Sequence, residues 1–430
     1  HVEGFAKEMA VVTHHRLIQD GKGKLIPDPE AKLEEPLVVR PTSETIIGDA
    51  MARWIISWRD LPLKLNQWAN VVRWEMRTRM FLRTAEFLWQ EGHTAHADAA
   101  EAKEHTLRTL EIYRAFAEES AAMPVIAGEK PENERFPGAE ETWSIEAMMQ
   151  DGKALQAGTS HYLGTSFAEA SGIRYQDKEG GQALAHTTSF GMSTRMIGGM
   201  IMVHGDDDGM RVPPALAPQQ VVILPMLRDQ PEDAALIDYC EGLRADIAAR
   251  SALQEAVRVR LDDRPGKAAA KRWDWVRRGV PVIIEVGGRD MENQSVTLIR
   301  RDDLWNTETG KLNTTTPSRD EAGQTIGTLL ESIQASMFDA AAKRRDASIT
   351  RGIDTLDGVR EFYAQGGKYP GWLEVQWSKP TGAALDKVEA VLKDLKLTLR
   401  NVPANAQAAD GICIFTGDPA VERVLVARAY

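Results

Sequence analysis

The segment from Asn66 to His96 carries charged and aromatic side chains at spacings that suit an anionic ligand. Its pattern predicts two strands joined by a charged turn, in which side chains two positions apart share a face. Guanidinium groups beside aromatic rings suit an anion and a flat ring better than an apolar core. A salt-bridged surface hairpin is the alternative that spacing alone leaves open. The side chains expected to converge are Arg73, Glu75, Arg83, Phe87 and Trp89.

A second polar cluster, Thr42-Ser43-Glu44, stands where a helix is expected to begin. The two hydroxyl groups are suitable N-caps, and apolar residues recur at helical spacing from residue 46 to residue 58. A sequence of Asp, Leu and Pro then stops the pattern. The cluster is either only a helix start or a place where Thr42 and Glu44 face a ligand.

Residues 154–161 form a third polar segment. We expect a strand that runs into a turn at Gly158 and presents Gln156, Thr159 and His161 together. An ordinary polar turn is the alternative. A second helix is expected over residues 98–123, and its predicted inner face is formed by Leu107, Leu110, Tyr113 and Phe116.

A fourth segment, residues 187–204, joins a strand to a helix. The strand is expected to end in a sharp turn at Gly191, with Ser193 as the cap of the following helix and Arg195 in its first turn. An arginine there adds to the positive end of the helix dipole, which is unfavourable unless an anion binds. A solvent-facing arginine is the alternative. The predicted inner face of the helix carries Ile197, Met200 and Ile201.

Two candidate metal sites in the sequence have too few ligands. His93 and His96 have no third ligand at a suitable spacing, so a structural or pocket-lining role is favoured. The acidic turn over residues 205–209 has Ala217 at the position where a calcium-binding loop needs a glutamate. Neither common glycine-rich phosphate loop is present.

Length and composition describe a multidomain globular chain. Its 430 residues are too many for one ordinary core, and 43% apolar with 27% charged residues is typical of a globular protein. No apolar run approaches the length of a membrane span. Two cysteines exclude a disulfide framework, and a net charge of −11 argues against nonspecific coating of nucleic acid. The chain begins at His1 without methionine, so we interpret it as a fragment.

From Gln219 onward the pattern changes to strands alternating with helices, which predicts a small α/β domain with a βαβ core. Its second helix, over residues 266–278, carries basic residues that can seat phosphates, although a solvated helix face is the alternative. These basic residues are Lys267, Lys271, Arg272, Arg277 and Arg278. A long helix over residues 321–343 and a small mixed region follow.

The spacing Arg-x-Glu, loop, Arg-x-x-x-Phe resembles motif 2 of the class II aminoacyl-tRNA synthetases, and Thr187 to His204 resembles their motif 3. Arg-Pro-Thr-Ser-Glu, followed by Asn-Gln-Trp and Val-Val-Arg-Trp-Glu, is similar to the prolyl-tRNA synthetases, in particular to the archaeal/eukaryotic-like subgroup. The resemblance implies an antiparallel-sheet catalytic domain (1–216), an α/β anticodon-binding domain (217–315) and a small mixed C-terminal domain (316–430). It also implies that the chain starts beyond motif 1, the dimer-interface segment.

The same resemblance implies roles for the polar residues. Arg73 would hold the α-phosphate and the amino-acid carboxylate, and Arg195 the γ-phosphate, as the catalytic cations. A carboxylate and a hydroxyl would satisfy the two protons of proline's ammonium, and an indole would pack against its ring. The implied proline pocket is Thr42, Glu44, Arg73, Trp89 and His161. The implied ATP contacts are Arg73, Glu75, Arg83, Phe87, Gln156, Thr159, Ser193 and Arg195, with Gln156 also facing magnesium. The weaker implied tRNA contacts are Lys271, Arg272, Glu285 and Arg289.

The activity implied by the resemblance is ATP-dependent attachment of L-proline to tRNA(Pro) through a prolyl-adenylate. The implied partners are ATP, Mg²⁺, L-proline, tRNA(Pro) and, in the full-length protein, a second subunit, in the cytoplasm and away from membranes. No zinc is expected, because Cys413 alone cannot supply a tetrahedral site. Two alternatives remain: a synthetase of this class for another amino acid, and a synthetase-like protein that binds tRNA or an amino acid without catalysis.

Overall fold

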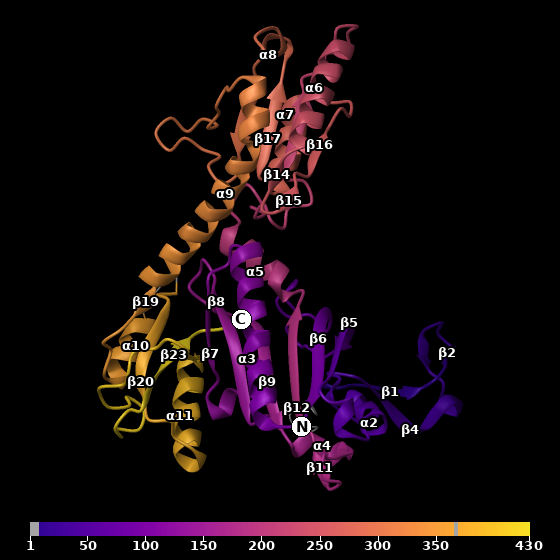
Figure 1. The fold of residues 1–430 in the computed structure, drawn as a ribbon, viewed down its shortest axis with the longest axis vertical. Helices are drawn as coiled ribbons and strands as arrows, with labels where there is room; N and C mark the ends of the chain where they lie inside the picture. The colour runs from indigo at the N-terminus through magenta and orange to yellow at the C-terminus, as the bar shows by residue number, and fades with distance from the viewer. Residues whose placement is uncertain (1–7, 365–368) are drawn as a thin grey trace.

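The computed structural model describes residues 8–364 and 369–430, which build three sheets of four or more strands and four two-stranded sheets. We call the four-stranded sheet between residues 221 and 300 the second sheet and the four-stranded sheet between residues 349 and 427 the third sheet. Figure 1 shows the second sheet and its helices at the top, the largest sheet below them and the third sheet beside the largest. A 29-residue helix, α9 (Arg319–Ala347), runs from the second sheet to the third. None of the helices in the described ranges is long and apolar enough to cross a membrane.

The largest sheet has seven strands, and all of its neighbouring strands pair antiparallel. Helix α3 (Ala99–Ala115) packs on one face of it, and α5 (Arg195–His204) follows one of its strands. In spatial order the strands are β22 (Val402–Pro403), β7 (Val125–Glu129), β8 (Glu141–Met148), β9 (Ala154–Gly164), β12 (His186–Ser193), β6 (Glu86–His96) and β5 (Leu63–Val72). The edge strand β22 comes from the C-terminal part of the chain.

The second sheet confirms the βαβ pattern predicted beyond Gln219. Its central strands β13 and β17 pair parallel, and only β18 runs antiparallel to its neighbour. Its strands are β16 (Val259–Leu261), β13 (Val221–Pro225), β17 (Val282–Val286) and β18 (Thr297–Arg300), with α6 (Asp233–Ala248), α7 (Ala268–Arg277) and α8 (Gly288–Glu292).

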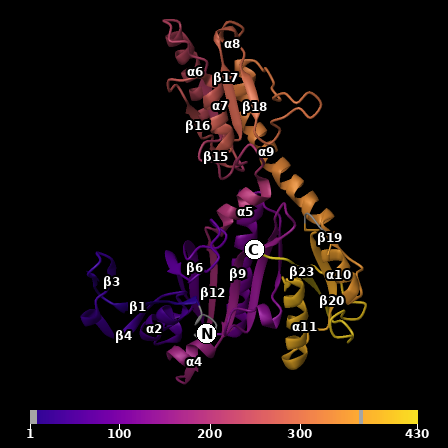
Figure 2. The ribbon, with the colours of Figure 1, turned by 180° about the vertical axis from the view of Figure 1, so that it is seen from behind.

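The third sheet combines short strands with two helices. Its strands are β19 (Ile349–Thr350), β20 (Trp372–Trp377), β23 (Glu422–Ala427) and β21 (Thr398–Leu399), with α10 (Leu356–Ala364) and α11 (Gly382–Leu395). On the opposite side of the largest sheet, an arm projects away from the molecule in both views (Figure 2). This arm contains β1 (Ala10–His14) paired with β4 (Lys32–Val39) and β2 (Leu17–Gln19) paired with β3 (Leu25–Pro27).

The helix after Thr42 and Ser43 is shorter than its apolar spacing predicts. Helix α2 spans Glu44–Trp54 and stops four residues before the predicted end at residue 58. The carboxylate of Asp60 accepts hydrogen bonds from the backbone N–H groups of Ile56 and Ser57, both at 2.9 Å. These N–H groups are therefore bonded to a side chain and do not continue the helical ladder.

Two predicted helix faces are partly wrong. On α3, Leu110 and Tyr113 are buried as expected, but Leu107 is 45% exposed. Phe116 is 39% exposed and stands at the first position of a π-helical turn, Phe116–Ser120. On α5, Met200 is buried and Ile201 packs against the core as predicted, but Ile197 is 41% exposed and Met196 is buried in its place.

The turn predicted at Gly158 is also wrong. Strand β9 continues through this glycine without a turn, and the local irregularity is a bulge. Ile145 pairs with Gly158 and Glu146 pairs with Gln156, so Ala157 is the extra residue. A Cβ atom at Gly158 would lie 3.2 Å from the ring of Tyr113, so close packing against α3 favours glycine here.

Candidate active site

The hairpin of β5 and β6 brings Arg73, Phe87 and Trp89 together as the sequence predicts, but Glu75 and Arg83 lie in the loop between the strands and do not join them. Val71 pairs with Phe87 and Ala69 with Trp89. Phe87 and Trp89 therefore share a face, on which the guanidinium carbon of Arg73 lies 5.4 Å and 5.7 Å from their ring centres. Arg73 Nε donates to the carbonyl oxygen of Pro41 at 2.9 Å, which fixes the plane of the guanidinium group.

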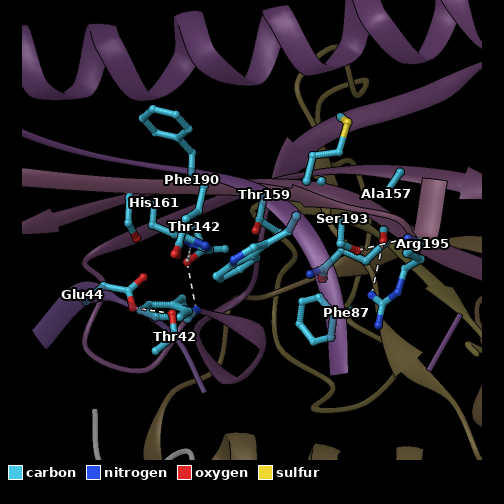
Figure 3. Close-up of a pocket in the computed structure, with 18 of the residues that line it drawn as sticks. Thr42, Glu44, Phe87, Thr142, Ala157, Thr159, His161, Phe190, Ser193 and Arg195 are labelled. Carbon is cyan, nitrogen blue, oxygen red and sulfur yellow. Dashed lines mark hydrogen bonds between the residues drawn. The ribbon is translucent and has the colours of Figure 1, made fainter. Parts of the chain in front are cut away.

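One pocket brings together the polar segments that are far apart in the sequence (Figure 3). Ten of the predicted site residues line it: Thr42, Glu44, Arg73, Phe87, Trp89, Gln156, Thr159, His161, Ser193 and Arg195. Glu75 and Arg83 lie outside it and line an adjoining pocket, where Arg83 Nη1 is 3.3 Å from Glu75 Oε2. In Figure 3, Phe190 points to the opposite side of the sheet from Thr42 and Glu44, and its ring contacts Tyr113 of α3.

At one end of the pocket a carboxylate is surrounded by hydroxyl and imidazole groups. Thr42 Oγ1 donates to Glu44 Oε2 at 2.5 Å, and both residues are buried. Across from them, His161 Nδ1 and Thr142 Oγ1 lie 3.0 Å apart, and the centre of the His161 ring lies 4.6 Å from that of Phe136, with the two rings tilted by 30°. Burial lowers the pKa of His161 to about 4, so its imidazole is neutral at physiological pH.

Ser43 does not cap α2 with its side chain, although it occupies the N-cap position. Its hydroxyl instead donates to Glu91 Oε1 at 2.5 Å, an oxygen that also accepts from Gln67 Nε2. The other Glu91 oxygen lies 3.2 Å from His93 Nε2. His96 contacts Glu101, with Nδ1 3.1 Å from its carboxylate. Within the described ranges no group of three or more potential ligands could hold a metal ion.

The other end of the pocket is strongly cationic. Ser193 Oγ accepts from the backbone N–H of Arg195 at 3.2 Å, but the N-cap position of α5 is Thr194, so the prediction that Ser193 is the cap is wrong. Arg195 Nε donates to the carbonyl oxygen of Leu82 at 3.0 Å. Burial, together with the nearby charges of Arg83 and Arg73, lowers the pKa of Arg195 to about 10. An anion bound between these cations would relieve their repulsion.

Several lining residues were not found by the sequence analysis. Thr142, Glu91 and the run Glu134-Arg135-Phe136 all border the pocket. The only sequence signal for that run is a Pro-Gly turn directly after it, at residues 137–138. The indole Nε1 of Trp89 is buried without a hydrogen-bond partner among the described residues, which makes it available to a ligand.

The C-terminal end of the chain also reaches the pocket edge. The backbone N–H of Tyr430 donates to the carbonyl oxygen of Ala154 at 3.2 Å, and Arg83 Nη2 donates to the Tyr430 oxygen at 3.1 Å. Tyr430 OH donates to Asp151. The sequence analysis did not predict this contact, because nothing local relates residues 347 positions apart.

The four candidate tRNA contacts occupy different environments on the second sheet. Lys271 is buried, and its ammonium donates to the carbonyl oxygens of Asp262 and Arg264 at 2.9 Å and 3.1 Å. Arg272 Nη1 lies 3.0 Å from both carboxylate oxygens of Glu285. Arg289 is exposed on α8. Lys271 therefore stabilises the loop that contains Asp262 and Arg264. The prediction that Lys271 lies on an exposed basic face is wrong.

Comparisons with known proteins agree with this geometry. Residues 28–204 match the tRNA synthetase class II core domain (G, H, P, S and T), and residues 220–316 match the anticodon binding domain. The chain is 70% identical over its whole length to a proline–tRNA ligase of Erythrobacter litoralis, of which it covers 84%. It is 51% identical to a proline–tRNA ligase of Bdellovibrio bacteriovorus, again with 100% of this chain and 84% of the relative covered.

A solved structure is also similar over nearly the whole chain. Prolyl-tRNA synthetase of Cryptosporidium parvum, complexed with L-proline and AMP, superimposes with a TM-score of 0.86 at 35% identity. The match covers 98% of this chain and 81% of that one. The class II core, the anticodon-binding domain and this level of identity establish that the chain belongs to the proline–tRNA ligase family of class II aminoacyl-tRNA synthetases.

Proposed function

We propose that the chain joins L-proline to tRNA(Pro) with the use of ATP. The observation that carries this proposal is the polarity of one pocket, with Thr42 and Glu44 at one end and Arg195 at the other. Arg73 lies between the two ends, beside the rings of Phe87 and Trp89. This arrangement suits a small ammonium-bearing amino acid next to a nucleotide triphosphate.

In the first step the proline carboxylate attacks the α-phosphorus of ATP, prolyl-adenylate forms and pyrophosphate leaves. Little acid–base chemistry is required, because the site must position two anions and stabilise the charge that builds up between them. Arg73 holds the two reacting anionic groups, Arg195 holds the γ-phosphate, and Phe87 stacks on adenine. In the second step a ribose hydroxyl at the tRNA 3′ end takes the prolyl group and AMP leaves.

The proline end of the pocket supplies specificity. The ammonium of proline has two protons, and Glu44 with Thr42 offers oxygen acceptors for both, while Trp89 packs against the ring. Neutral His161 adds polarity without a second positive charge near the ammonium. A synthetase for another amino acid would need a different set of side chains at this end of the pocket. A non-catalytic binding protein would not need both Arg73 and Arg195, and both line the pocket.

Magnesium fits the nucleotide end of the pocket as a companion of ATP. Gln156 and Thr159 offer neutral oxygen atoms, which suit an ion whose remaining ligands are phosphate oxygens and water. When bound, it neutralises phosphate charge. Glu75 and Arg83 border the nucleotide from the adjoining pocket.

The second sheet would bind the anticodon. Arg289 is exposed, and Arg272 is paired with Glu285. These three side chains can form hydrogen bonds with the edges of unstacked bases. The rings of Trp273 and Trp305 stack nearby on the same domain, with centres 5.8 Å apart. We retain the domain limits 1–216, 217–315 and 316–430, with the addition that β22 of the third domain completes the first domain's sheet.

A homodimer accounts for the exposed apolar residues around the arm and β5. Trp68 is 82% exposed, and the same region exposes other apolar side chains: Leu17, Leu25, Leu37, Val38, Ile46 and Trp54. Monomers rarely leave such a surface uncovered. Sedimentation of the full-length protein would test the subunit number. We place the enzyme in the cytoplasm, where charged tRNA is used by ribosomes.

The direct test is proline-dependent exchange of pyrophosphate into ATP. Serine, threonine, alanine and the absence of an amino acid serve as controls. Exchange with proline alone would support both activation and specificity. A folded protein that supports no exchange with any amino acid would refute the proposed activity in favour of a binding role.

A further inference from the structure

A buried charged cluster lies where the third domain meets the largest sheet. Glu146 of β8 is fully buried, with Lys130 Nζ 3.0 Å from one of its oxygens and Arg400 Nη2 2.6 Å from the other. Arg400 Nε makes a second bond to the same oxygen at 3.1 Å. Arg400 belongs to the C-terminal domain, directly after β21 and two residues before β22. The proposed catalytic steps use none of these three residues.

Arg400 is fixed in place by its own domain. Its Nη1 donates to Thr398 Oγ1 at 2.9 Å, and its backbone N–H donates to the carbonyl oxygen of Leu425 at 2.7 Å. Burial alone would raise the pKa of Glu146, but the charges of Arg400 and Lys130 outweigh burial and lower it to about 2. Glu146 is therefore a buried anion that shares its charge balance between Lys130 of its own domain, at Oε1, and Arg400 of another domain, at Oε2.

Glu146 stands on the face of the sheet that carries the pocket. Thr142 and Glu146 are four positions apart on β8, so they share a face, and each pairs across the ladder with a pocket residue. Thr142 pairs with His161, and Glu146 pairs with Gln156 at the bulge. The buried anion is thus the direct cross-strand neighbour of a residue at the nucleotide end.

Arg195 is close enough to respond to this anion. Its Nη1 lies 3.5 Å from the carbonyl oxygen of Gln156, and the charges of both Arg400 and Glu146 act on it. With Arg400 in place, Glu146 is already neutralised by two cations. Without Arg400, Lys130 and the Ser144 hydroxyl still bind Glu146 Oε1, both at 3.0 Å, but Oε2 loses both of its bonds and would draw Arg195 or the amide of Gln156 toward it.

We propose that Arg400 is a positioning residue for ATP: by neutralising Glu146 from the C-terminal domain, it keeps Arg195 and Gln156 available to the phosphates. The inference rests on the proposed function for the identity of the ligand. It predicts that loss of Arg400 weakens ATP binding and leaves proline binding almost unchanged, because Thr42 and Glu44 lie at the far end of the pocket.

The test measures binding of magnesium–ATP by calorimetry without proline, and the KM values of ATP and proline in pyrophosphate exchange. Arg400→Met should raise the ATP dissociation constant by about tenfold or more and change the proline KM by less than about twofold. Arg400→Lys keeps the charge and should restore ATP binding to within about threefold. The double variant Arg400→Met/Glu146→Gln removes the unpaired anion and should also recover most of the affinity.

Arg423→Met is the matched control. Arg423 lies in the same domain, is largely buried and is 2.7 Å from Asp410, but it does not contact Glu146. It should leave the ATP dissociation constant within about twofold of the parent. Should Arg400→Met fail to fold, Thr398→Val removes the acceptor that orients Arg400 and keeps every charge, and it should weaken ATP binding by about twofold to fourfold.

Unchanged ATP binding in Arg400→Met would overturn the inference, as would an equal loss of ATP and proline affinity, which a merely structural role predicts. If Arg400→Met does not fold, unchanged ATP binding by Thr398→Val would overturn the inference in the same way. ATP binding that depends on Arg400 in a protein without proline-dependent exchange would support the inference and refute the proposed amino-acid activity.

Discussion

Replacement of Arg73 by methionine tests the centre of the proposed mechanism. Methionine retains apolar contact with Phe87 and Trp89 but removes the guanidinium group that lies 5.4 Å and 5.7 Å from their ring centres. The bond from Arg73 Nε to the Pro41 carbonyl, at 2.9 Å, is also lost. The fold should tolerate the change, because the side chain lies at a pocket wall and not within a packed core.

The expected loss follows from the bonds that a guanidinium group makes to anions. A hydrogen bond between charged groups contributes about 1.5–3 kcal/mol, so two bonds to the α-phosphate and the carboxylate amount to about 3–6 kcal/mol. Each 1.36 kcal/mol of transition-state stabilisation is worth about a factor of ten in rate. We therefore expect kcat/KM for proline-dependent pyrophosphate exchange to fall by about 10²–10⁴-fold.

Arg59→Met is a suitable control for this experiment. Arg59 is exposed and lies 4.6 Å from the Trp58 ring centre, an arginine–indole contact outside the pocket. Its replacement should change exchange by less than about twofold. Circular dichroism and thermal melting would establish that both variants fold. Exchange by Arg73→Met within tenfold of the parent would show that the assigned role of Arg73 is wrong.

Three further predictions concern pH, packing and tRNA. Burial lowers the pKa of His161 to about 4 in the folded protein. Between about pH 6.5 and pH 4 the imidazole therefore takes up a proton in the unfolded chain but not in the folded one. Its contribution to stability is therefore complete above about pH 6.5 and falls by about 2 kcal/mol by pH 5. Urea unfolding of His161→Gln should have a shallower pH dependence, and an unchanged slope would contradict a buried neutral imidazole. Gly128→Ala would place a Cβ atom 2.2 Å from a carbonyl oxygen of β22, so the free energy of unfolding should fall by about 1–3 kcal/mol, whereas Gly288→Ala, with open space around it, should have little effect. Arg289→Ala should raise the KM for tRNA in aminoacylation without changing pyrophosphate exchange. Lys271→Met should instead lower thermal stability, because its ammonium donates to two backbone carbonyls; a tRNA defect without loss of stability would refute that assignment.

Local patterns predicted a large part of the fold. The alternation along β5 and β6 placed Phe87 and Trp89 on one face because strand side chains alternate whatever the surroundings. After Gln219 the sequence pattern changes to apolar runs that alternate with helical spacing, and this predicted a βαβ unit. The prediction was possible because apolar residues recur with different periods in buried strands and in amphipathic helices. Boundaries were less predictable: α2 ends at Trp54 because the carboxylate of Asp60 binds two backbone N–H groups, and apolar spacing carries no information about that bond.

The candidate site was predictable as a set of side chains but not as a complete environment. Short motifs identified Thr42, Glu44 and Arg195, and the pocket unites them. The same motifs did not identify Thr142, which meets His161 only through the pairing of β8 with β9. Strand pairing depends on register over many residues, so a motif of five or six residues cannot reveal it.

The sequence by itself determined which residue types could bind an anion, an ammonium group and a flat ring, because that chemistry belongs to the side chains and their local spacing. Only the tertiary structure decided where charges far apart in the chain meet. Arg400 and Glu146 are separated by 254 positions, yet their charges lie 2.6 Å apart beside Gln156. Lys271, which looks like one member of a basic surface, is buried against backbone carbonyls. Burial and long-range pairing change the energy of a charge by more than its neighbours in the sequence do, and both arise only when the chain folds.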